Sequence, residues 1–155
     1  MKKNTHGLRL TAYGLLLIVC SLQFSSCAQP AFDAKENTTA SVSRMFESDA
    51  NQAYYAVRWA LKTSGYSIIS EDLQNGILTS GWRPSTVDSH YVDPFGRKDY
   101  GVNGAYFKLE VKIMPNEGST NKTKIEISSR VKSLLAHLKS SEIEEKKILG
   151  KVADY

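Results

Sequence analysis

Two groups of residues in this 155-residue chain are of types that do chemistry: the thiol of Cys27, and the cluster Asp88, Ser89, His90 and Asp93. Carboxylates and an imidazole can ligate a metal, and a hydroxyl beside an imidazole can act as a nucleophile. Near neighbours on one loop rarely have the rigid geometry that either reaction needs. The sequence also has no nucleophile elbow, phosphate-cradling glycine loop or HExxH motif. We therefore expect no enzyme, no metal site and no cofactor.

The residues before Cys27 have the order of a bacterial export signal. Three basic residues come first, an apolar core follows over about residues 12–22, and the small residues Ser25 and Ser26 stand next to the cysteine. The core is far shorter than the roughly 20 residues of a membrane-spanning helix. The pattern predicts a signal peptide over residues 1–26, ending at a cysteine that can be lipidated.

The four residues Phe24-Ser25-Ser26-Cys27 resemble the lipobox of bacterial lipoproteins, with Phe24 where that family usually has leucine. The resemblance implies that a diacylglycerol is attached to the thiol and that signal peptidase II cuts before Cys27. The mature protein would then be held at a membrane by its N-terminal lipid. A second cut is open, because Ser26 and Ala28 also suit signal peptidase I, which would release a soluble chain that starts at Gln29.

Removal of the signal changes the charge balance. Lys2, Lys3 and Arg9 leave with it, so the mature part keeps 17 of the 20 Lys and Arg residues against 16 Asp and Glu. A net charge near +1 gives no general affinity for nucleic acid, which we exclude as a partner. Cys20 also leaves, so Cys27 is the sole mature cysteine, and a disulfide framework or thiolate metal site is excluded.

The regular elements that position the remaining residues begin after a polar stretch. Residues 27–47 have no sustained helical or strand period and are expected to form a flexible tether. Ser48 or Asp49 can cap a helix, and Gly65 suits its C-terminal end. Between them an apolar stripe follows helical spacing, and its members are Ala50, Ala53, Tyr54, Val57, Ala60 and Leu61.

Four strands and a second helix complete the predicted domain over residues 48–155. Residues 66–70 and 76–82 flank Asn75-Gly76, a strong hairpin signal. Residues 105–114 and 124–131 alternate apolar and charged side chains, as strands buried on one face do. Ser141 with Glu144 forms a capping box before a last helix. We therefore predict an α+β fold in which both helices cover one face of a four-stranded antiparallel sheet.

The folded part also resembles a known family. The run 53–57, Gly65-Tyr66, the strand 75–79 and Trp82 are similar to the helix-grip domains of BamC-type lipoproteins, and the likeness extends over about residues 49–155. That family carries two such domains and a long N-terminal segment, whereas this chain has one domain and a short tether. The resemblance implies an accessory lipoprotein of the outer membrane, facing the periplasm, that works through contacts with an envelope protein.

The long non-periodic stretch 83–104 is where we expect function, because long loops in compact domains are commonly functional. Aromatic and basic side chains gather there, as in protein-contact hot spots. The candidate contact residues are Trp82, Arg83, His90, Tyr91, Phe95, Arg97, Lys98 and Tyr100. The sequence thus favours a lipid-anchored protein-interaction module that is not an enzyme, and the BamC-type resemblance relates it to outer-membrane protein assembly. The alternative is a periplasmic domain that binds a small ligand or lipid.

Overall fold

The computed structural model describes residues 34–100, 104–116, 118, 121–135 and 137–155. By its contacts the chain divides into two compact units, Met1–Phe32 and Asp33–Tyr155. All described helices, strands and core residues belong to the second unit, which therefore holds a complete core of its own. The predicted signal peptide and Cys27 lie outside the described residues.

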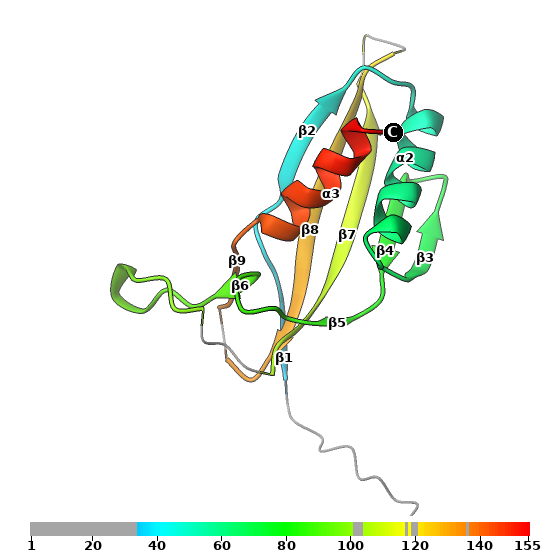
Figure 1. The fold of residues 1–155 in the computed structure, drawn as a ribbon. Helices are drawn as coiled ribbons and strands as arrows, with labels where there is room; N and C mark the ends of the chain where they lie inside the picture. The colour runs from blue at the N-terminus through cyan, green and yellow to red at the C-terminus, as the bar shows by residue number, and fades with distance from the viewer. Residues whose placement is uncertain (1–33, 101–103, 117, 119–120, 136) are drawn as a thin grey trace, which may run out of the picture. The chain divides into compact units, whose positions relative to one another are not determined.

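A seven-stranded antiparallel sheet forms the frame of the second unit (Figure 1). Its main strand order is β1-β8-β7-β4-β3, while β2 also pairs with β8 and β5 with β7. The strands are β1 Lys35–Thr38, β2 Val42–Phe46, β3 Ile68–Asp72, β4 Ile77–Ser80, β5 Arg83–Pro84, β7 Tyr106–Pro115 and β8 Thr123–Ser133. The short strands β6 His90–Tyr91 and β9 Lys139–Ser140 form a second sheet.

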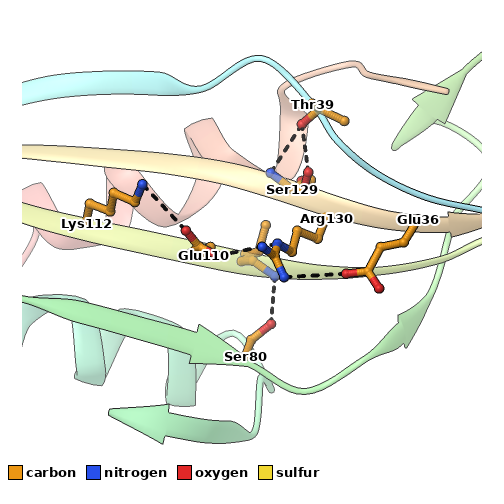
Figure 2. A network of polar contacts seen from close by, with 8 residues as sticks. Glu36, Thr39, Ser80, Glu110, Lys112, Ser129 and Arg130 are labelled. Atoms are coloured by element: carbon orange, nitrogen blue, oxygen red, sulfur yellow. Dashed lines mark hydrogen bonds and ion pairs between the residues drawn. The ribbon is translucent and has the colours of Figure 1, made fainter. Parts of the chain in front are cut away.

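The predicted four-stranded sheet is therefore wrong, although its four strands exist as β3, β4, β7 and β8. The additional long edge comes from β1 and β2, which pair with successive parts of β8. At the break between them, the backbone N–H and the Oγ1 of Thr39 donate to the Ser129 carbonyl at 2.8 and 3.1 Å. Ser129 N–H donates back to Thr39 Oγ1 at 3.2 Å (Figure 2). The prediction of a tether up to residue 47 is accordingly wrong from Lys35 onward.

Two helices cover one face of this sheet (Figure 1). Helix α2, Ala50–Thr63, begins as predicted at Asp49, whose side chain accepts from Gln52 N–H at 2.8 Å, and Gly65 follows it with φ +77°. Its predicted stripe packs against the inward side chains of β7 and β8. Burial of each large apolar side chain stabilises the fold by roughly 1.5–3 kcal/mol.

Helix α3, Ile143–Ala153, packs beside α2 but does not begin with the predicted capping box. Its N-cap is Glu142, in a left-handed conformation with φ +67° and without a side-chain cap. The Ser141 hydroxyl donates instead to the Ser89 carbonyl at 3.0 Å. The residue expected to cap the helix therefore fastens the segment that leads into β6.

Candidate functional site

Within the stretch expected to carry function, residues 91–100 fold into a small hairpin that extends away from the large sheet (Figure 1). We call residues 91–100 the Phe95 hairpin. Val92 and Asp99 exchange two backbone hydrogen bonds, of 3.0 and 2.9 Å, and the turn closes with Arg97 N–H donating to the Pro94 carbonyl at 3.3 Å. The hairpin is therefore held by its own backbone.

The tip of the hairpin presents an aromatic side chain to solvent. Phe95 is fully exposed and has φ +59°, in the left-handed region that costs a bulky residue energy. On the returning arm, Arg97 and Lys98 are also exposed. An exposed phenylalanine in a strained conformation beside two cations has no evident role in folding.

The stem of the hairpin stacks its aromatic side chains. The rings of Tyr91 and Tyr100 lie 5.3 Å apart, and Lys98 Nζ lies 4.9 Å from the Tyr91 ring centre. At the base, Lys139 Nζ pairs with Asp93 Oδ2 at 3.0 Å, which ties the hairpin to β9. Five of the eight predicted contact residues thus come together here: Tyr91, Phe95, Arg97, Lys98 and Tyr100.

His90, predicted as a contact residue, is instead buried where the hairpin joins the body. It is 1% exposed, and its ring centre lies 4.9 Å from that of Phe107 in the core. Nδ1 lies 3.1 Å from Ser85 Oγ and 3.0 Å from Ser89 Oγ, whereas Nε2 has no hydrogen-bond partner among the described residues. Burial lowers the pKa of His90 to about 4, partly offset by the charge of Glu144, so the ring is neutral at pH 7.

A β-bulge decides which faces of the sheet Trp82 and Arg83 point to. Thr79 pairs with Glu110, and Arg83 pairs with Phe107. The chain therefore advances four residues from β4 to β5 while the paired strand β7 advances three, so one extra residue bulges out of the ladder. Trp82 consequently lies on the outer face, with Lys108 Nζ 4.7 Å from its ring centre. The Arg83 guanidinium lies over the Tyr66 ring at 4.5 Å and donates to the Ser64 carbonyl at the end of α2, so it stabilises the fold and does not extend to a partner.

The other residues considered for chemistry are not arranged for it. Asp93 is paired with Lys139, and both Ser89 and His90 are buried beyond the reach of a substrate. Within the part of the chain that the structure describes, no three His, Cys, Asp or Glu side chains are grouped so that they could hold a metal ion.

The charged outer face of the sheet satisfies most of its own charges. Glu110 pairs with Lys112 at 3.7 Å and with Arg130 at 3.5 Å, and Arg130 also pairs with Glu36 at 3.6 Å (Figure 2). Exposed pairs of this kind contribute about 0–1 kcal/mol each. The charged side chains of β7 and β8 thus have partners within the sheet itself, and their presence does not require a partner protein.

Sequence reasoning missed a groove of about 490 Å³ between β2 and the two helices. Its apolar walls include Phe46, Val152 and Tyr155, and Arg44 lies over the Phe46 ring at 5.4 Å. Its signal in the sequence is the large apolar Phe46, which follows Met45 in a stretch otherwise suited to a tether.

Comparisons with known proteins find no matching family model and no matching curated protein. Among solved structures, norcoclaurine synthase from Thalictrum flavum with dopamine and hydroxybenzaldehyde is 11% identical, with 78% of this chain and 86% of that chain covered and a TM-score of 0.40. Ara h 8.0201 is 11% identical, covering 78% and 100%, with a TM-score of 0.34. A protein from Bacillus thuringiensis is 10% identical, covering 77% and 92%, with a TM-score of 0.30. Likenesses this distant carry no argument about what this chain does.

The buried imidazole predicts a pH-dependent stability. Because the folded pKa of His90 is about 4 against 6.5 in the unfolded chain, the neutral ring stabilises the fold fully above pH 6.5, and this contribution is lost as pH falls from 6.5 to 4. The free energy of unfolding of the wild type should therefore fall by about 3 kcal/mol more over this range than that of His90→Gln. Urea unfolding at a series of pH values measures it. His137→Gln, which changes an exposed histidine, should retain the wild-type slope, and equal slopes for wild type and His90→Gln would contradict the assignment.

Proposed function

We propose that this chain is a lipid-anchored envelope protein that acts without catalysis, as an accessory interaction module with the Phe95 hairpin as its contact element. The observation that carries the proposal is the exposed Phe95 at the tip of a backbone-bonded turn. Phe95 is more exposed than any other large apolar side chain of the described residues, and the hairpin holds it away from the body (Figure 1).

The physical case rests on preorganisation. A side chain held on a hydrogen-bonded turn loses less conformational entropy on binding than one on a free loop. Burial of Phe95 in a partner's pocket would contribute on the order of 1.5–3 kcal/mol. Arg97 and Lys98 beside it would steer the hairpin to an acidic surface, and Tyr91 and Tyr100 add aromatic area of the kind that dominates interfaces.

The membrane anchor is proposed from the sequence, through Phe24-Ser25-Ser26-Cys27 and its resemblance to a lipobox. In the described part of the chain, no helix has both the length and the apolar character needed to cross a membrane. We place the protein on the periplasmic side of an outer membrane, and the BamC-type resemblance is what suggests a role near outer-membrane protein assembly.

Site-specific photo-crosslinking in envelopes tests the contact element. A benzoylphenylalanine in place of Phe95 should give an adduct with a protein of defined mass, because this position faces the partner. The same probe in place of Leu73, which is exposed on the turn after β3, is the matched control and should give none. Reversal of the charge in Arg97→Glu/Lys98→Glu should reduce the adduct by roughly tenfold, equivalent to about 1.4 kcal/mol. Absence of an adduct from position 95, or the same adducts from both positions, would overturn the proposal.

The second candidate function is the binding of a small apolar ligand, and the groove between β2, α2 and α3 favours it. A volume of about 490 Å³ lies within the range of ligand pockets. The anionic apolar dye anilinonaphthalene sulfonate should bind saturably there. Gln52→Glu, which adds a negative charge to the groove without changing the side-chain size, should weaken binding by roughly tenfold, while Leu73→Glu adds the same charge elsewhere and leaves it unchanged. Unsaturable binding, or binding that Gln52→Glu leaves intact, would dismiss this candidate.

A further inference from the structure

One end of the large sheet gathers exposed apolar side chains that the Phe95 hairpin does not include. Lys35 pairs with Ser133 and Tyr106 with Lys132, so the start of β1, the start of β7 and the end of β8 lie together. Leu134 and Leu135 follow directly, in a turn where Leu135 N–H donates to Ser133 Oγ at 3.1 Å. The chain therefore enters its folded unit beside a pair of leucines on an ordered turn.

These side chains are open to solvent. Leu134 is 62% exposed, Leu135 48% and Tyr106 50%, and Trp82 on the adjoining strand segment is 38% exposed. Tyr106 belongs to the terminal pair of the β7–β8 ladder, opposite Lys132, and Trp82 lies against Lys108, two residue pairs farther from the turn on the same outer face. Aliphatic residues thus occupy the turn, and amphipathic aromatic residues lie on the adjoining outer face of the sheet.

The same end carries three unpaired lysines beside one carboxylate, Glu36, which lies opposite Lys132 and pairs with Arg130 at 3.6 Å. Lys35, Lys108 and Lys132 make no ion pair with any of the described residues. Farther along the outer face, Lys112 and Lys124 are paired with carboxylates. We call this set the Leu134 end, and its members are Lys35, Trp82, Tyr106, Lys108, Lys132, Leu134 and Leu135.

The position of Cys27 indicates what the Leu134 end faces. Since β1 begins at Lys35, eight residue steps separate it from Cys27, a reach of at most about 29 Å. An acyl chain on Cys27 would therefore hold this end of the sheet next to a bilayer. This step rests on the proposed anchor, whereas the composition of the Leu134 end is independent of it.

We propose that the Leu134 end docks on the surface of an anionic lipid bilayer. Leu134 and Leu135 enter below the headgroups, and Trp82 and Tyr106 lie at headgroup depth, where their apolar rings and polar tips are both satisfied. The ammonium groups of Lys35, Lys108 and Lys132 meet lipid phosphates, which a surface of negative potential attracts.

Vesicle co-sedimentation of residues 28–155, which lack Cys27 and retain the complete core, tests the proposal without the anchor. At low salt the chain should bind vesicles of phosphatidylethanolamine with phosphatidylglycerol, and should bind pure phosphatidylcholine much more weakly. Leu134→Ser/Leu135→Ser should reduce partitioning by about tenfold or more, and Lys132→Gln by about fivefold. Ile69→Ser/Leu73→Ser, which removes two exposed apolar residues at the β3 edge, is the matched control and should bind like the wild type.

The outcomes separate this proposal from the anchor. Failure of the wild-type chain to bind anionic vesicles, or binding that Leu134→Ser/Leu135→Ser leaves unchanged while circular dichroism shows it folded, would overturn the docking surface whether or not Cys27 is acylated. Binding that is lost in Leu134→Ser/Leu135→Ser and kept in the β3 variant would support it, even if the cell leaves Cys27 unmodified. Equal loss in both double variants would mean nonspecific apolar adhesion and would also overturn the proposal.

Discussion

The antiparallel ladder between β7 and β8 is the interaction on which the rest of the structure depends. It runs over ten residue pairs, from Tyr106 opposite Lys132 to Pro115 opposite Thr123. Because side chains alternate along a strand, one face of this pair is apolar and the other charged. Both helices cover the apolar face, β4 continues the sheet from β7, and β1 with β2 continues it from β8. The positions of the Phe95 hairpin and the Leu134 end follow from where these strands begin and stop.

Polar side chains inside this frame fix its irregular points. Ser80 Oγ accepts from Leu109 N–H at 2.8 Å at the bulge where β4 gives way to β5. The buried Glu145 of α3 accepts from the hydroxyls of Ser129 and Ser140, which joins the helix to β8 and to β9. Buried polar groups are costly without partners, so these bonds specify one register. They also set which way Trp82 and Arg83 point and how the hairpin is carried.

Much of this frame could be predicted from the sequence, because its signals are local. The alternating side chains of β7 and β8 and the apolar stripe of α2 each indicate a buried face. Asn75-Gly76 indicates the turn between β3 and β4. The strands β1 and β2 could not be predicted, because edge strands such as Lys35–Thr38 bury few side chains and so show no apolar period. Their place is defined by backbone pairing with β8, which is a long-range contact. For the same reason the orientation of the side chains in residues 83–100 could not be predicted, since the bulge turns Arg83 inward and the contact with Phe107 buries His90.

Together these features describe a domain whose first strand begins eight residues after Cys27, which we propose is acylated. The apolar and basic Leu134 end lies beside the start of that strand. The measurement that tests this account most directly is the intact mass and detergent partitioning of the exported protein, with Cys27→Ala for comparison. The account predicts a mature chain that begins at Cys27, carries acyl chains and enters the detergent phase, with both properties lost in Cys27→Ala. An unmodified chain that begins at Gln29 and stays in the aqueous phase would contradict it.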